Sequence, residues 1–77
     1  MKLEIITPEK NVFNGEADLV QLPGSDGLFE ILKNHAPMIA ALGKGNVKIG
    51  NNDKFEFIEI NGGVVEVLNN RILVLAE

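Results

Sequence analysis

A serine and a histidine stand close enough in this sequence to raise the question of nucleophilic catalysis. Ser25 and His35 are ten residues apart, and the chain contains no other serine or histidine. A hydrolase of this kind needs a nucleophile beside a base that a third group orients, and no residue stands out as that third group. We interpret Ser25 as a turn residue and His35 as a loop residue, and keep a hydrolase that uses His35 as a rival hypothesis.

Metal and phosphate chemistry have even less support in the residue pattern. Glu16 and Asp18 share one face of an expected strand, which could form a weak metal site but more simply makes a solvated strand face. A single histidine excludes a His-rich zinc site, and the absence of cysteine excludes a thiolate site. The stretch 23–27 is rich in glycine but lacks the Lys-Ser/Thr end of a phosphate-binding loop. We therefore predict no catalytic residue, metal or cofactor.

Charge and composition narrow the classes of partner. The chain has 77 residues and a formal net charge of −4, and its seven basic residues are scattered. A protein that binds the nucleic-acid backbone needs clustered Lys and Arg, so we predict no nucleic-acid partner. The apolar runs 38–42 and 72–76 are far shorter than the about 20 residues that a membrane-spanning helix needs. These features predict a soluble, cytoplasmic chain that meets a membrane only indirectly, through another protein.

Short alternating segments dominate the chain, and no segment shows helical periodicity over three turns. Turn signals recur every eight to ten residues, at positions such as 23–27, 50–53 and 69–70. This spacing predicts an all-β fold, a β-sandwich or flattened barrel of eight to ten short, mostly antiparallel strands, in one domain over residues 1–77. The alternation assigns the interior to Leu3, Ile5, Val20, Leu22, Val47, Ile49, Phe57, Val65, Val67, Ile72 and Val74.

Four local features are less regular. Asn14-Gly15 is a strong turn signal. The segment 38–42 fits either a strand or a helical turn. Phe55 and Phe57 have the opposite parity to Ile58 and Ile60, which predicts a β-bulge or a strand that is buried on both sides. The nearly continuous apolar segment 71–76 predicts another strand with both faces buried.

Two apolar pairs next to loops are not needed for the predicted interior. Leu28-Phe29 and Met38-Ile39 either extend the core or form an exposed patch that binds a protein partner. The sequence pattern leaves both readings open.

Several motifs in order along the chain resemble the epsilon subunit of the F-type ATP synthase. Each motif is weak alone, but together they cover nearly the whole chain. They are Leu3-x-Ile5-Ile6-x-Pro8 with Phe13-x-Gly15, Pro23-Gly24-x-x-Gly27-x-x-x-Ile31-Leu32-x-x-His35-Ala36-Pro37, Leu42-x-x-Gly45-x-Val47, the stretch 60–67, and the stretch 70–77.

The resemblance implies a ten-stranded β-sandwich at the foot of the central rotor stalk, on the cytoplasmic face of the bacterial plasma membrane. The subunit is not catalytic and helps to couple ion-driven rotation of the c-ring, through the gamma subunit, to ATP synthesis or hydrolysis. By this resemblance the c-ring-facing set is Leu28, Phe29, Glu30 and His35, and the gamma-facing set is Pro37, Ile39 and Leu42.

The chain departs from the family pattern in two places. Glu30 occupies a position where the family usually has glycine; a glutamate with positive φ would be costly, so we expect an ordinary extended conformation there. The family commonly continues into a carboxy-terminal helical hairpin beyond Glu77, so we expect inhibition by that hairpin to be absent. The alternative function is a sandwich that binds a small ligand such as a carbohydrate, although the chain lacks Trp and Tyr, the usual stacking residues.

Overall fold

Nine β-strands make up the fold, and the computed structural model describes all of residues 1–77. No helix long and apolar enough to cross a membrane is present. The strand count lies within the eight to ten predicted from the turn spacing and is one fewer than the ten that the resemblance implied. The strands are β1 Lys2–Ile6, β2 Asn11–Glu16, β3 Leu19–Gly24, β4 Gly27–Leu32, β5 Met38–Leu42, β6 Gly45–Asn51, β7 Lys54–Ile60, β8 Gly63–Leu68 and β9 Arg71–Ala76.

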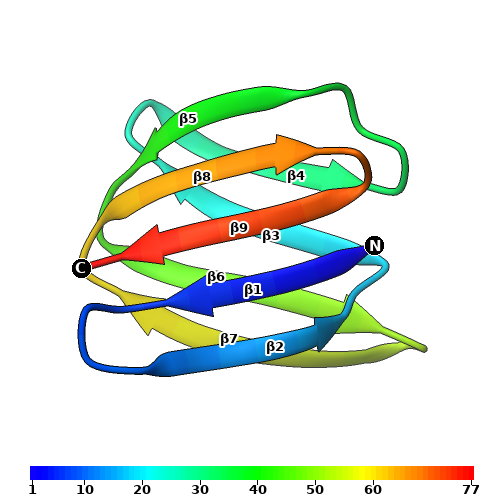
Figure 1. Cartoon of the computed structure of the whole chain (residues 1–77), viewed down its shortest axis with the longest axis horizontal. Helices are drawn as coiled ribbons and strands as arrows, with labels where there is room; N and C mark the ends of the chain where they lie inside the picture. The colour runs from blue at the N-terminus through cyan, green and yellow to red at the C-terminus, as the bar shows by residue number, and fades with distance from the viewer.

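The strands form two facing layers, as Figure 1 shows. One layer has the order β2-β1-β9-β8-β5, and the other contains β4, β3, β6 and β7. The layers are joined where Gly24 of β3 pairs with Leu42 of β5. Every strand pair is antiparallel except β1 with β9. The predicted all-β, mostly antiparallel sandwich is therefore confirmed.

Asparagine and aspartate make the tight turns at one end of the sandwich. The β6–β7 hairpin turns at Asn52 and Asp53, with φ of 54° and 62°, and the β8–β9 hairpin turns at Asn69 and Asn70, with φ of 53° and 60°. Two successive residues with positive φ form the turn whose twist matches the flanking strands, and Asn and Asp tolerate this conformation best among non-glycine residues. These two predicted hairpin turns are confirmed.

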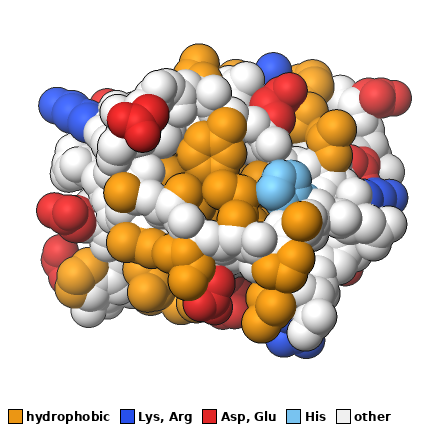
Figure 2. Space-filling view, turned by 90° about the horizontal axis from the view of Figure 1, so that it is seen from above, with side chains coloured by type: hydrophobic (Ala, Val, Ile, Leu, Met, Phe, Trp, Pro, Cys, Tyr) orange, Lys and Arg blue, Asp and Glu red, His pale blue; other side chains and the backbone are white.

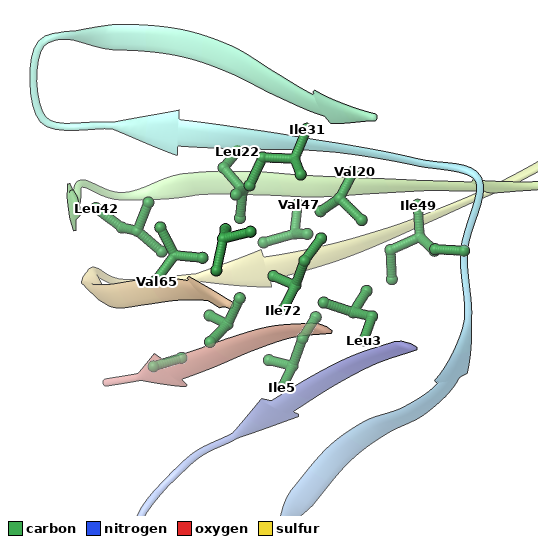
Figure 3. Packing of buried hydrophobic residues seen from close by; sticks show 14 of the residues in the cluster. Leu3, Ile5, Val20, Leu22, Ile31, Leu42, Val47, Ile49, Val65 and Ile72 are labelled. Carbon is green, nitrogen blue, oxygen red and sulfur yellow. The ribbon is translucent and has the colours of Figure 1, made fainter. Parts of the chain in front are cut away.

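The core lies between the two layers and consists of sixteen buried hydrophobic residues (Figure 3). Alternate residues of each strand point inward, as the period of two requires. Leu3, Ile5, Val20, Val47 and Val74 illustrate this, since none of them exposes any measurable surface. Every residue that the alternation assigned to the interior is buried except Phe57.

The prediction for Phe57 was wrong, and so was the predicted bulge in its strand. Strand β7 pairs with β6 in an unbroken register, so Phe55 and Phe57 share one face and Ile58 and Ile60 share the other. Ile60 is buried and Ile58 packs against the core, whereas Phe57 is 60% exposed. The parity conflict is resolved because the two isoleucines face inward, where the other layer covers them.

Three other local predictions are settled by strand pairing. Asn14-Gly15 is no turn but lies inside β2, where it pairs with Leu3 and Glu4 of β1. The segment 38–42 is a strand. Segment 71–76 is buried on one face only, because Leu75 is 51% exposed on the other face of β9.

Candidate interaction surface

The residues of the predicted c-ring-facing set lie on β4 and on the loop that follows it. Leu28 is 69% exposed, Glu30 is also exposed, and Phe29 is half-buried and packs against the core. Glu30 lies in the middle of β4, and its φ is not positive, so the expected extended conformation is confirmed. His35 is exposed in the loop between β4 and β5, beyond the other end of β4 from Leu28.

The residues of the predicted gamma-facing set differ from one another in exposure. Pro37 is exposed just before β5, and Ile39 of β5 is 72% exposed. Leu42, at the end of β5, is only 6% exposed and belongs to the core. Its side chain therefore supports the strand from inside, and only Pro37 and Ile39 offer side chains to a partner.

A shallow groove brings members of the two sets together. It runs between β4 and β5, and Leu28 and Phe29 line it from one side while Met38 and Ile39 line it from the other. Figure 2 shows hydrophobic side chains gathered at the centre of this face, bordered by the chain's one histidine. Exposed contiguous apolar surface of this kind marks contact sites on soluble proteins. Of the two readings left open by the sequence, the exposed patch holds for Leu28 and Ile39, and the core reading holds in part for Phe29 and Met38.

A second apolar area, on the outer face of the β5-β8-β9-β1 layer, was missed by the sequence analysis. The strand register places Ala41, Val64, Leu75 and Ile6 in one row across these four strands. Val64 is 41% exposed and Leu75 is 51% exposed. The signal for this row was present in the apolar run 71–76, but that run was interpreted as burial on both faces.

Polar contacts tie together the loops at the end of the sandwich opposite the β3–β4 turn. The backbone N–H of Asn34 donates to Asn70 Oδ1 at 2.9 Å, which holds the β4–β5 loop against the β8–β9 turn. His35 Nδ1 lies 2.7 Å from the carbonyl oxygen of Ala36. Because a carbonyl can only accept, Nδ1 is the donor of this hydrogen bond. The loop that carries His35 is therefore held in place while the ring remains accessible.

Asp18 links the same end of the fold from the layer of β3. Its Oδ2 accepts the backbone N–H of Asn52 at 3.1 Å, and its Oδ1 lies 3.4 Å from Lys33 Nζ. The hydrogen bond from Asn52 and the nearby charge of Lys33 lower the pKa of the Asp18 carboxyl. This carboxylate connects the β6–β7 turn to the end of β4.

The geometry brings no catalytic group together. Ser25 lies in the β3–β4 turn and His35 beyond the far end of β4, so about 20 Å of extended strand separates them. No cluster of three His, Asp or Glu side chains could hold a metal ion. The surface that the fold builds is suited to protein contact rather than to chemistry.

Comparison with known proteins identifies the family. The family model described as the ATP synthase delta/epsilon chain β-sandwich domain matches residues 1–77. The ATP synthase epsilon chain of Chlorobium limicola is 48% identical over 99% of this chain and 88% of that protein. The epsilon chain of Leptospira interrogans is 42% identical over the whole of this chain, which spans 61% of the length of that relative.

Solved structures share the fold at low sequence identity. A chain in the Euglena gracilis mitochondrial ATP synthase structure, which includes OSCP, F1 and the c-ring, superposes with a TM-score of 0.89 at 16% identity, covering 96% of this chain and 48% of that one. A chain in the central stalk and c-ring of the Tetrahymena thermophila mitochondrial ATP synthase gives 0.81 at 17% identity, covering 97% and 61%. This chain belongs to the ATP synthase delta/epsilon family, whose β-sandwich domain it forms.

Proposed function

We propose that this chain is a non-catalytic rotor subunit in the central stalk of an F-type ATP synthase. In this role it couples ion-driven rotation of the c-ring, through the gamma subunit, to ATP synthesis or hydrolysis. The observation that carries the proposal is the match of the whole chain, residues 1–77, to the delta/epsilon family. The shared fold with chains of two mitochondrial ATP synthases is consistent with it.

The proposed partners are the gamma subunit and the c-ring, at the cytoplasmic face of the bacterial plasma membrane. We assign Pro37 and Ile39 to the gamma contact and Leu28, Phe29, Glu30 and His35 to the c-ring contact. High exposure of Leu28 and Ile39 supports their part in this assignment. Leu42 acts indirectly, by packing β5 against the core. The small-ligand alternative is not favoured, because the matching family model and the relatives named above are all ATP synthase chains.

Co-purification tests the proposal directly. A tagged copy of the chain is produced in the organism that encodes it, and its membranes are extracted with mild detergent. We expect gamma, the catalytic subunits and the c subunit to be recovered with the tagged chain. Recovery of the chain without any ATP synthase subunit would overturn the proposal. A saturable small ligand recovered in their place would support the alternative.

A further inference from the structure

Three strands, β2, β4 and β7, pair with one neighbour each, namely β1, β3 and β6, and so have one open edge. Strand β5 pairs with β8 and meets β3 only at Gly24↔Leu42, so its edge over residues 38–40 is open as well and borders the same groove as the β4 edge. An unpaired edge presents free N–H and C=O groups and is a template for a strand of another chain. Folded proteins usually block such edges with bulges, charges or inward-pointing charged residues.

Two of the three edges carry these blocking features. The register of β2 against β1 shifts between Ile5 and Ile6. Strand β7 carries Lys54, Glu56 and Glu59, and Glu56 pairs with the buried Ile49, so that this charge lies on the inward-facing side of an edge strand. Addition of a strand to either edge is therefore opposed.

Strand β4 has neither a register shift nor an inward-facing charge. Its register against β3 is regular from Leu19↔Leu32 to Gly24↔Gly27. Glu30 is its only charged residue, and the neighbouring outward-facing residues Leu28 and Leu32 are 69% and 54% exposed. The β4 edge is thus both regular and apolar, in contrast to the edges of β2 and β7.

The direction of the backbone groups on β4 follows from Pro23. Proline has no N–H, so Pro23 and Leu28 form a pair that exchanges no hydrogen bonds. The Pro23 carbonyl instead accepts from Gly43 N at 2.7 Å, on the opposite edge of β3. By alternation, Leu28, Glu30 and Leu32 direct their N–H and C=O groups away from β3, where no strand meets them.

The surroundings of this edge indicate the chemistry of its occupant. The groove that Leu28, Phe29 and Ile39 line lies beside it and offers apolar contact (Figure 2). Asp26 lies in the turn at the start of β4, and neither Asp26 nor Glu30 takes part in the two ion pairs of the structure. A complementary strand would place a basic side chain opposite Glu30 and apolar side chains on either side of it.

We propose that β4 is a docking edge to which a partner protein adds an extended segment with the outward pattern apolar–basic–apolar. Main-chain hydrogen bonds to Leu28, Glu30 and Leu32 supply affinity, and the basic residue opposite Glu30 sets the register. This inference does not rest on the proposed function, since it concerns how a segment binds and holds for any partner that carries this pattern.

A synthetic peptide tests the edge without the rest of any complex. The probe is the capped heptapeptide Thr-Leu-Val-Lys-Val-Leu-Thr, which places Leu, Lys and Leu on one face, titrated into the ¹⁵N-labelled full chain. We expect saturable shifts centred on the amides of β4 and slower hydrogen exchange at Leu28, Glu30 and Leu32. Absence of saturable binding up to about 1 mM peptide, or protection of β2, β5 or β7 without protection of β4, would overturn the proposal.

Two proline variants give a matched comparison. Glu30→Pro and Glu59→Pro each remove one glutamate charge and one N–H from an unpaired edge. Glu59 pairs with Asn46, a position that by alternation from the two-residue β6–β7 turn exchanges no hydrogen bonds. We expect E30P to weaken peptide binding at least about tenfold and E59P to leave it unchanged. Equal affinities for the two variants would refute a β4 site.

A charge-reversal variant tests the same site without introducing a proline. Glu30→Lys retains the backbone N–H and places like charges opposite one another. We expect E30K to bind the Lys peptide at least about threefold more weakly and to prefer a peptide with Glu in place of Lys. Unchanged preference between the two peptides would contradict the assignment of Glu30 as the residue that sets the register.

Discussion

Two neighbouring side chains on β4 lie in opposite surroundings, so the same substitution should affect folding stability at one of them and hardly at the other. Ile31 exposes no surface, and Leu32 is 54% exposed. We expect Ile31→Ala to lower the free energy of unfolding by about 2–5 kcal/mol, because it leaves a cavity in the core. Leu32→Ala removes a similar volume from the surface and should change the free energy of unfolding by only about 0.5 kcal/mol. Denaturant titration of both variants measures the difference, and equal losses would contradict the core assignment.

Ile39 is the residue where the proposed gamma contact can be tested most sharply. It is 72% exposed, so Ile39→Asp should cost about 1 kcal/mol or less of folding stability. Under the proposed function, the same change places a charge in an apolar contact and should weaken gamma binding at least about tenfold. Unfolding measurements and gamma titration on the same preparation give the two quantities.

Phe57→Asp is the control for that prediction, because Phe57 is 60% exposed on the outer face of the other layer. It carries a comparable cost of placing aspartate in a strand, but should leave gamma affinity unchanged. If Ile39→Asp instead abolished folding, while affinity per folded molecule stayed constant, Ile39 would act only in the stability of the domain.

Asp18 makes the folding stability of the molecule depend on pH in a direction that the structure defines. Its pKa is lowered in the folded state by the hydrogen bond from Asn52 and by Lys33. A carboxyl with a lowered folded pKa contributes stability above its unfolded pKa of about 3.9. That contribution is lost as the pH falls through the folded pKa.

Asp18→Asn should therefore be less stable than the wild type at pH 7, and the difference should shrink towards zero as the pH falls below about 4. Urea unfolding at a series of pH values measures this. Asp26→Asn removes the same charge from a residue that has no ion pair and serves as the control. A difference that stays constant down to pH 2 would show that the Asp18 carboxylate is not the cause.

At the scale of turns and strand ends, three glycines form a graded series. Gly43 has an ordinary φ, and an added Cβ there would make only ordinary van der Waals contact. Gly27 has φ of +130° with nothing within 4 Å of an added Cβ, whereas Gly63 has φ of +142° and an added Cβ would collide with the Leu75 carbonyl oxygen. Replacement by alanine should be near neutral at Gly43, cost about 1–2 kcal/mol at Gly27 and cost more at Gly63. Thermal unfolding should reproduce this order, and a neutral Gly63→Ala would contradict the backbone geometry at the start of β8.

The inward-facing residues were predictable from the sequence on the strands that lie in the middle of a layer. Val65 and Val74 lie on neighbouring central strands, and both are buried as predicted. The prediction failed for Phe57 because β7 is an edge strand, and no sequence pattern states which of two apolar faces the other layer covers. Pairing with β1 likewise overrides the local turn preference of Asn14-Gly15.

The candidate surface was predicted less well than the core, for a related reason. Leu28 and Ile39 were recognised as surplus to the interior, and both are exposed. Leu42 was assigned to a partner contact although it lies in the core, and Leu75 was assigned to burial although it is exposed. Exposure at these positions depends on which strands face each other across the layers, and that arrangement involves residues far apart in sequence.

Considered as a whole, the domain exposes apolar side chains on the outer faces of both layers. Leu75 and Val64 lie on one layer, and Phe55, Phe57 and Leu32 on the other. A chain of 77 residues has little surplus stability, because burial in so small a domain barely offsets conformational entropy. Under the proposed function, contact with a neighbouring subunit would cover this apolar surface and stabilise the fold at the same time.

If gamma is the partner, as proposed, this coupling predicts that gamma raises the thermal stability of the chain. Gamma at about 100 times its Kd should stabilise the folded state by about 2.7 kcal/mol, which raises the Tm of a domain this small by about 10 °C or more. Calorimetry of the chain with increasing gamma measures the shift. At the same gamma concentration, Ile39→Asp should lose at least about half of it, while Phe57→Asp keeps it. A Tm that does not move at saturating gamma would mean that gamma binds the unfolded and the folded chain equally tightly. Binding to gamma would then contribute nothing to the stability of the domain.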